Sequence, residues 1–267
     1  MSPSVIRRNS KSRIVAVIAM NTFREIMRDR ILYGIVVFAL LLIGLSIALG
    51  ALSFAEQARI SADFGFAGIQ LSAVVLAIFA GSSLVAREIE KQTILTLLAK
   101  PVSRTQFLLG KFVGLASVVI VVMSGLGVVL ALLLVYLGFD LQISFVWALL
   151  GILTEALILI SAALLFGSFA KPMMTVVYVL AIFLIGHWLD SLNFFMNKGS
   201  TSASFKMVAF VLTNLLPNLE KLNWRSAPVY GTILPAESVV LSVAYGLGWI
   251  VILLSITGLV FRRRDFV

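Results

Sequence analysis

The sequence has no cysteine and a single histidine, His187, among its 267 residues. Without cysteine the chain can form no disulfide, no thiolate nucleophile and no cysteine-ligated zinc site. One histidine likewise excludes a metal site built from several histidines of one chain. His187 together with Met196 and Met207 gives no defined ligand set for copper, so we interpret these side chains as packing residues and expect no bound metal.

The sequence also lacks the motifs of catalysis. Its only Gly-Lys pair, Gly110-Lys111, is preceded by Thr105 where a P-loop has its first glycine, and Phe112 follows where the P-loop has Ser or Thr. No ATP site of that kind is therefore predicted. There is no His-Glu-x-x-His and no Gly-x-Ser-x-Gly, and no two acids share an apolar run. We expect neither catalytic residues nor a cofactor.

Charge is scarce as well. Only 12% of the residues are charged and 61% are hydrophobic, whereas soluble domains average about a quarter charged and half apolar. The apolar residues are gathered in blocks, which is typical of membrane proteins. The net charge of +9 could suggest nucleic-acid binding. However, the basic residues lie beside the ends of the apolar blocks, where topology signals occur.

Six apolar runs are long enough, or nearly so, to cross about 30 Å of hydrocarbon at about 1.5 Å per residue. They cover residues 31–54, 64–86, 112–139, 141–170, 172–189 and 238–261. The run at 172–189 is short, so its helix can begin earlier or stand with little tilt. We predict an all-α integral membrane protein that forms one membrane domain with six transmembrane helices.

The basic residues predict the orientation of these helices. Sixteen of the 21 lysines and arginines lie in residues 1–30, in the connection 87–111, at Lys171 and in 262–264, all on one side, and five lie on the other. The positive-inside rule then places both termini in the cytoplasm. An even number of spans agrees with this topology.

Residues 12–30 precede the first span and have helical periodicity. One face carries Ala19, Met20, Phe23, Ile26 and Met27, and the other carries Asn21, Arg24, Glu25 and Arg28. Such a pattern with basic residues on the polar face predicts an amphipathic helix lying in the inner interface. The alternative is a simple cytoplasmic extension of the first span.

The sequence of the connection 87–111 predicts a short capped helix on the cytoplasmic side. Thr93 can cap a helix that runs to about Ala99, and Pro101 prevents its continuation. Ser103 with Gln106 forms a capping box that starts the third span. Four apolar residues of this short helix need a membrane or a partner to cover them, namely Ile94, Leu95, Leu97 and Leu98.

The outer segment 190–237 is predicted to contain a helix that is too short to span. Phe205, Val208, Ala209, Leu212 and Leu216 follow helical spacing. We predict an interfacial or re-entrant element here. Prolines at 217, 228 and 235 are expected to interrupt the chain that follows.

Glu155 is the one acid inside the predicted fourth span, near its middle. A charge at this depth is costly and usually faces protein or water. Glu155 could therefore line the translocation path or a gate. The alternative is a structural acid, protonated or hydrogen-bonded to Thr154, to Ser161 or to a neighbouring helix.

Glycines are paired in two of the spans. Gly110 and Gly114 open the third span, and Gly246 and Gly248 lie in the sixth. Small residues of this kind permit close approach of helices. Ordinary packing within the chain is the preferred interpretation of each pair.

The connection 87–111 also carries a motif. In order it contains the acid Glu88, the pair Gln92-Thr93, the leucines Leu97-Leu98, then Pro101-x-Ser103-Arg104 and Gly110-Lys111. With the interfacial helix, six spans and a long outer element, this arrangement resembles the permease subunits of ABC transporters of the type 2 exporter class. Gln92 departs from the glycine that the family often has.

The resemblance implies a function and partners. Residues 93–99 would be the coupling helix that docks on a separate cytoplasmic P-loop ATPase, and the transporter would contain two permeases, as a homodimer, and two ATPases. The coupling residues would be Glu88, Thr93, Ile94, Leu97, Leu98, Pro101, Ser103, Arg104 and Lys111. The host membrane would be a bacterial or archaeal cytoplasmic membrane.

The outer sequence 216–223 is also similar to a subgroup of these permeases that is associated with maturation of multicopper enzymes, which would imply a periplasmic partner. Two other classes stay open at this point. One is a secondary transporter or channel, and the other is a membrane scaffold. The substrate is not indicated, since fold does not choose among substrates.

Overall fold

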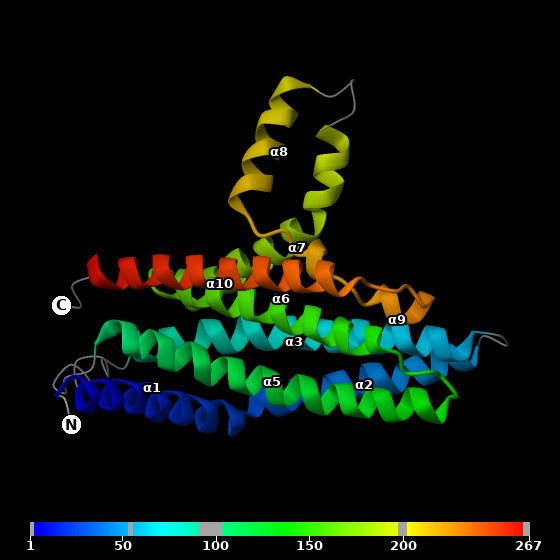
Figure 1. Ribbon diagram of the computed structural model, residues 1–267, viewed down its shortest axis with the longest axis horizontal. Helices are drawn as coiled ribbons and strands as arrows, with labels where there is room; N and C mark the ends of the chain where they lie inside the picture. The colour runs from blue at the N-terminus through cyan, green and yellow to red at the C-terminus, as the bar shows by residue number, and fades with distance from the viewer. Residues whose placement is uncertain (1–2, 53–55, 91–102, 197–201, 264–267) are drawn as a thin grey trace.

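The computed structural model describes residues 3–52, 56–90, 103–196 and 202–263. Every regular element in these ranges is a helix (Figure 1). The elements are α1 (Pro3–Met27), α2 (Arg30–Ala51), α3 (Gln57–Glu90), α5 (Arg104–Tyr136), α6 (Ile143–Gly167), α7 (Pro172–Met196), α8 (Ala203–Leu215), the 3-10 turn η1 (Glu220–Leu222), α9 (Ser226–Tyr230) and α10 (Ala236–Arg263).

Six of the described helices are long and apolar enough to cross a membrane, which confirms the predicted number of spans. They are α2, α3, α5, α6, α7 and α10. Several extend beyond the predicted apolar runs. Helix α3 begins at Gln57, and its first turn contains Arg59, which pairs with Glu56 at 3.0 Å. A helix can continue past the hydrocarbon where its polar side chains reach water.

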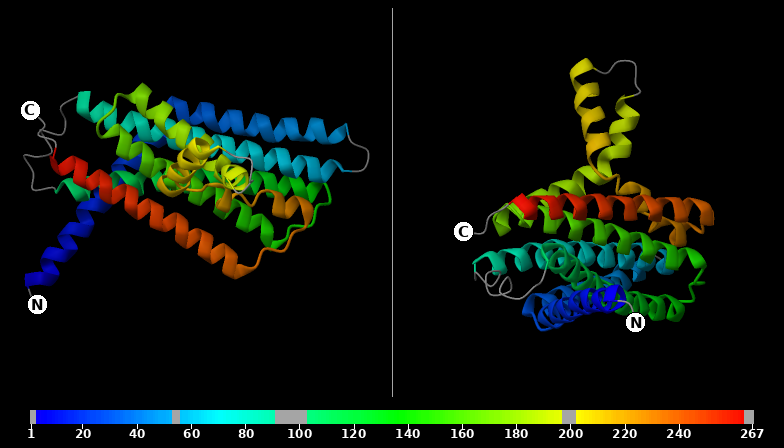
Figure 2. Two further views of the ribbon diagram at one scale, coloured as in Figure 1. Left: turned by 90° about the horizontal axis from the view of Figure 1, so that it is seen from above. Right: turned by 60° about the vertical axis from the view of Figure 1, so that its left-hand side comes forward.

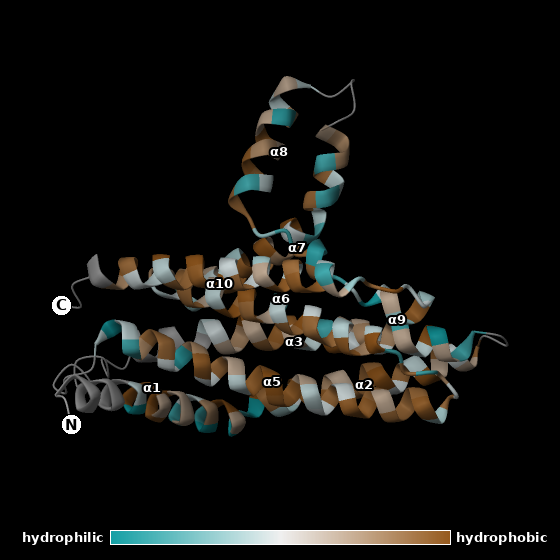
Figure 3. Ribbon diagram, in the orientation of Figure 1, coloured by the Kyte–Doolittle hydropathy of each residue, from teal (hydrophilic) through white to brown (hydrophobic). Residues whose placement is uncertain are grey.

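Helix α6 is at the centre of the bundle. Helices α2, α3, α5, α6 and α10 run side by side, and α6 packs against α3, α5, α7 and α10 (Figures 1 and 2). Three successive residues, Ile158, Leu159 and Ile160, are completely buried, so α6 is covered on all sides. Apolar residues predominate along these helices (Figure 3). The interior is therefore formed around the helix that carries Glu155.

Helix α1 lies along α5 at one end of the bundle, and the C-terminal end of α10 is at the same end (Figures 1 and 2). It spans Pro3–Met27, so it begins and ends earlier than the predicted segment 12–30. The break has a physical cause, since the Asp29 carboxylate accepts a hydrogen bond from the Ile31 amide at 3.0 Å and caps α2. The packed face carries Ala19, Thr22 and Ile26.

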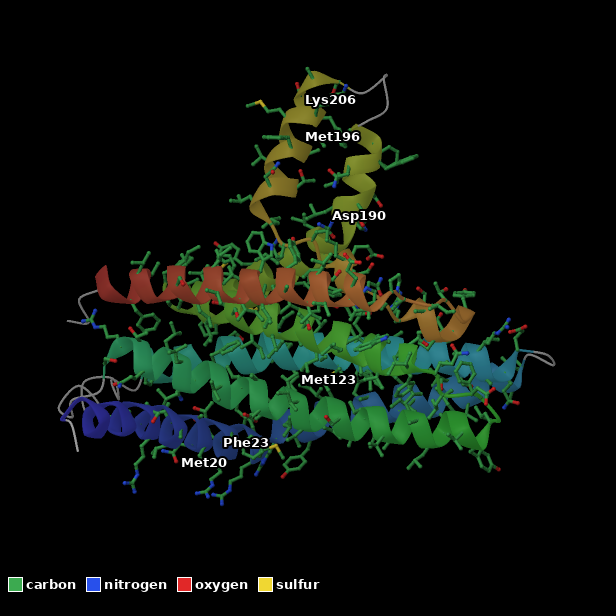
Figure 4. The ribbon with its side chains drawn as sticks, viewed as in Figure 1. Met20, Phe23, Met123, Asp190, Met196 and Lys206 are labelled. Carbon is green, nitrogen blue, oxygen red and sulfur yellow. The ribbon has the colours of Figure 1, made fainter. Side chains whose placement is uncertain are left out.

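One residue of the predicted apolar face of α1 does not pack within the chain. Met20, predicted on the apolar face, is 51% exposed, and Figure 4 shows it beside Phe23. Thr22 takes its place against α5, because the close approach of the two helices needs a small side chain there rather than an apolar one.

Helix α7 leaves the bundle part-way along its length. Its last buried residue is Leu189, after which it turns away and forms a projecting hairpin with α8 (Figures 1 and 2). Asp190 lies near the base of this hairpin, and Met196 and Lys206 lie toward its far end (Figure 4). The short run 172–189 is therefore the part of α7 that packs in the bundle.

A short helix is present at the predicted position as α8, which ends at Leu215 before Pro217. The chain then returns to the bundle and forms η1 and α9 against α6 and α3. Pro228 does not interrupt this segment as predicted. It lies inside the single turn of α9, close to its start, where the missing amide proton costs no helical hydrogen bond.

Candidate functional site

The start of α5 has the capping box that the sequence predicts. The Gln106 amide donates to Ser103 Oγ at 3.3 Å, and the Ser103 amide donates to Gln106 Oε1 at 3.0 Å. Two of the amide groups left over at a helix start are thereby satisfied. The capping box fixes where α5 begins and thus where the preceding connection joins it.

The next residue ties α5 to the last helix. Arg104 Nη1 donates to the backbone carbonyl of Phe261, which lies near the end of α10. Hydrogen bonds from a charged donor are among the stronger ones in proteins. The end of the connection 87–111 is therefore held to α10 as well as to α5.

Two glycines bring α5 against α1. A Cβ atom at position 110 would lie 2.6 Å from Ile18 Cβ, and one at position 114 would lie 2.7 Å from the Ala19 carbonyl oxygen. Both distances are shorter than real contacts of a Cβ atom. Gly110 and Gly114 thus form a smooth strip on which α1 rests.

Lys111 lies between these glycines and is only 7% exposed. Its Nζ is 3.8 Å from Glu25 Oε2 on α1 and 5.7 Å from the centroid of the Phe107 ring. A buried lysine needs partners of this kind. The N-terminal end of α5 is thus attached to α1 by packing and by an ion pair.

A second polar group lies in the interior around Glu155, which is 1% exposed. Gln70 Nε2 of α3 donates to Glu155 Oε2 at 2.9 Å. Arg225, from the chain between η1 and α9, donates through Nη1 to Gln70 Oε1 at 3.1 Å. One amide side chain therefore bridges a carboxylate and a guanidinium.

His187 of α7 completes this group, which we call the Glu155 cluster (Gln70, Glu155, His187 and Arg225). Its Nδ1 lies 3.1 Å from the Phe183 carbonyl and must donate there. Its Nε2 is then free to accept from Gln70 Nε2 at 3.4 Å. Glu155 Oε1 has no hydrogen-bond partner among the described residues, and His187 Nε2 lies 3.8 Å from it.

The chain that brings Arg225 inward is packed between helices. The Leu219 amide donates to the Gly186 carbonyl at 3.1 Å, and Asn218 Nδ2 donates to Asp190 Oδ1 at 2.6 Å. Leu219 and Leu222 are fully buried. Residues 216–225 therefore fill the space beside α6 that α7 leaves when it turns away.

A family model described as ABC-2 family transporter protein matches residues 16–266. The chain belongs to the ABC-2 family. It is the membrane permease component of such a transporter. The chain carries no ATPase, because in this family the ATPase is a separate subunit with which the permease generally pairs. Comparison with curated proteins gives no significant match.

For this ABC-2 permease, the structure brings together three of the predicted coupling residues, Ser103, Arg104 and Lys111, at the N-terminal end of α5. Glu88 lies near the end of α3, and its side chain is outside the described part. The others lie outside the described residues altogether, namely Thr93, Ile94, Leu97, Leu98 and Pro101.

The sequence did not single out Gln70 and Arg225 of the ABC-2 permease. A glutamine inside the apolar run 64–86 is the signal from which the role of Gln70 could have been predicted. Arg225 entered the sequence analysis only as one of the five basic residues assigned to the outer side. Glu155 does form the predicted hydrogen bond to a neighbouring helix, through Gln70. The alternative hydrogen bonds to Thr154 or Ser161 of its own helix are not present. Thr154 and Ser161 instead donate to the carbonyls of Leu150 and Leu157 in their own helix.

The side chains weighed as copper ligands lie in different surroundings. His187 faces the Glu155 cluster, whereas Met207 is 73% exposed on α8. Met196 lies at the far end of α7 in the hairpin (Figure 4). Within the described ranges, no group of three or more His, Cys, Asp or Glu residues could hold a metal ion.

Proposed function

We propose that this permease couples ATP hydrolysis by two copies of a separate cytoplasmic P-loop ATPase to export across a bacterial or archaeal cytoplasmic membrane. Residues 93–99 are the coupling helix of this proposal, with Ile94, Leu97 and Leu98 as the apolar surface that docks on the ATPase. The observation that carries the proposal is the attachment of the inner end of α5 to two other helices.

Through this attachment, a movement of the connection 91–102 would be transmitted to the helices of the bundle. Arg104 links the start of α5 to α10, and Gly110 and Gly114 press α5 against α1. A force at the connection would thus move α1, α5 and α10 as a unit. A two-state bundle whose equilibrium is biased by nucleotide on the ATPase needs a rigid linkage of this kind.

The proposed topology places both termini in the cytoplasm, with two permease copies forming a homodimer. Two observations support it. The two ends of the described chain lie at the same end of the bundle, and this end is also where the basic connection 87–111 leaves α3 and enters α5 (Figure 1). The amphipathic pattern of α1 supports its placement in the inner interface.

We further propose that Glu155 lies on the translocation path, at a level closed in this conformation by residues 216–225. The multicopper-maturation subgroup, with a periplasmic partner, is the specific assignment that the outer sequence 216–223 favours. Asn218, Leu219 and Leu222 of that sequence pack against the helices. Glu220 accepts a hydrogen bond from Asn223 at 3.1 Å, and Lys221 lies over the Tyr245 ring, and we expect these two charges to face the partner.

Copurification tests the docking role. The tagged permease is coexpressed with its ATPase subunit, and Leu97→Asp with Leu98→Asp is expected to abolish recovery of the ATPase. The reason is that the two new aspartate carboxylates would be buried without partners at the interface with the ATPase. Leu52→Asp, at the opposite end of α2 where Leu52 is 78% exposed, is the matched control and should retain the ATPase. Undiminished recovery with the double variant would refute the docking role.

A further inference from the structure

The outer half of the bundle contains a chain segment that is not a membrane-spanning helix. Helix α7 turns away after Leu189, and residues 216–225 lie in its place. A Cβ atom at Gly151 of α6 would lie 2.2 Å from the Leu222 carbonyl oxygen, so the segment is pressed directly on α6. The Asn218 amide donates to Tyr245 Oη of α10 at 2.8 Å. The segment is therefore enclosed by α6, α7 and α10.

This segment introduces one cation to the interior. Arg225 donates to Gln70 Oε1 at 3.1 Å, and the same side-chain amide donates to Glu155 at 2.9 Å. Because Arg225 occupies the oxygen of Gln70, the nitrogen must face Glu155 and His187. The orientation of Gln70 is thus fixed by the arginine on one side and by the carboxylate and imidazole on the other.

We propose that Arg225, Gln70 and Glu155 form a latch that holds residues 216–230 inside the bundle, and that the outer side of the permease opens by release of Arg225 from Gln70. Withdrawal of the segment would remove the guanidinium and leave Gln70 Oε1 without a donor, while Glu155 would lose the cation that is joined to it through Gln70. Unpaired polar groups in a buried site cost free energy. Insertion of the segment into the bundle and completion of the hydrogen bonds around Glu155 are therefore coupled.

His187 is a positioning residue in this latch. Its Nδ1 is held by the Phe183 carbonyl, so the ring is oriented with its Nε2 toward Gln70. Phe183 also packs against the imidazole, with ring centroids 4.8 Å apart. The latch therefore joins α3, α6, α7 and the outer segment, four parts of the chain that must separate for the outer half to open.

The role of the latch in transport rests on the proposed function, but the experiment that tests the latch does not depend on transport. Hydrogen–deuterium exchange of the full chain in lipid nanodiscs, read by mass spectrometry, needs neither ATPase nor substrate. Arg225→Gln should accelerate exchange about tenfold or more in peptides covering 216–230, because a charge-assisted hydrogen bond in a buried site is lost. Exchange in α5 should not change.

The matched control removes another outer arginine. Arg59→Gln deletes a partner of Glu56 in an exposed ion pair and should leave exchange in 216–230 unaltered. Glu155→Gln combined with Arg225→Gln should accelerate exchange no more than the larger of the two single changes, since both act on one latch.

Arg225→Lys keeps the charge and should give exchange between that of the wild type and that of Arg225→Gln. If Arg225→Gln does not fold, the lysine variant is read by the same criterion. Unchanged exchange in 216–230 would overturn the latch. Acceleration spread equally over α5 and α6 would also overturn it, because it would mean that the cluster stabilises the whole bundle rather than one segment.

Discussion

At the scale of single residues, a few small residues determine how α1 and α5 of the permease pack together. Gly114 and Gly125 lie on the same helix, α5, but in different surroundings. A Cβ at Gly114 would meet the Ala19 carbonyl oxygen at 2.7 Å and Thr22 Cβ at 2.6 Å, whereas nothing lies within 4 Å of one at Gly125. Only the first glycine is required by a neighbouring helix.

Gly114→Ala should therefore destabilise the attachment of α1. The methyl group meets a backbone oxygen that cannot rotate away, and overpacking of this kind costs roughly 1–3 kcal/mol. For a chain of this size, roughly 1 kcal/mol lowers the melting temperature by about 2–4 °C. Thermal unfolding of the purified permease in detergent measures the effect. Gly125→Ala is the control, and an equal shift for both would contradict the packing account.

At the scale of elements, the α7–α8 hairpin is attached to the bundle only at its base. Helix α8 packs chiefly against α7, and a single residue of it, Ala209, is buried. Large apolar side chains of α8 are exposed, among them Phe210 at 62% and Leu215 at 66%. The hairpin thus contributes little to the fold of one protomer.

Replacing residues 194–213 with a short Gly-Ser linker should leave the bundle folded. The change keeps Asp190, which holds Asn218, and removes few buried contacts. We expect the melting temperature to stay within about 3 °C of the wild type, a shift of about 1 kcal/mol or less. Size-exclusion chromatography and thermal unfolding give the measurement. An aggregated or unfolded product would show that the hairpin belongs to the core.

The apolar runs of the sequence predicted the six spans because a bilayer requires about 20 apolar residues in a helix. The capping box at Ser103 could also be predicted, because it depends on two residues that are close together in the sequence, and the structure contains it. Helix ends were missed where the chain leaves the hydrocarbon, as at Gln57, since water permits a helix to continue with polar side chains.

The burial of residues 216–225 could not be predicted. Asn218, Glu220 and Arg225 read as an exposed loop, and only the departure of α7 from the bundle creates the space that the segment fills. Gln70 was overlooked for a related reason. One amide in a long apolar run has no local signature, and its role depends on partners 85 and 155 residues away in the chain.

At the scale of the whole molecule, the permease has two linked regions. The N-terminal end of α5 is joined to α1 and α10, and the centre of α6 is joined to α3, α7 and the segment 216–225. Helices α5, α6 and α10 pack directly against one another, so they connect the two regions. A change at the connection between α3 and α5 therefore has a continuous packed route to the segment 216–225.

The most direct test of the account is the ATP hydrolysis rate of the separate ATPase with and without this permease. In lipid nanodiscs, the ATPase subunit that pairs with the permease should hydrolyse ATP at least several-fold faster with the wild-type chain than alone. The Leu97→Asp, Leu98→Asp permease should return the rate to that of the isolated ATPase. Equal rates with the wild-type and the doubly substituted permease would contradict the claim that residues 93–99 couple this chain to an ATPase.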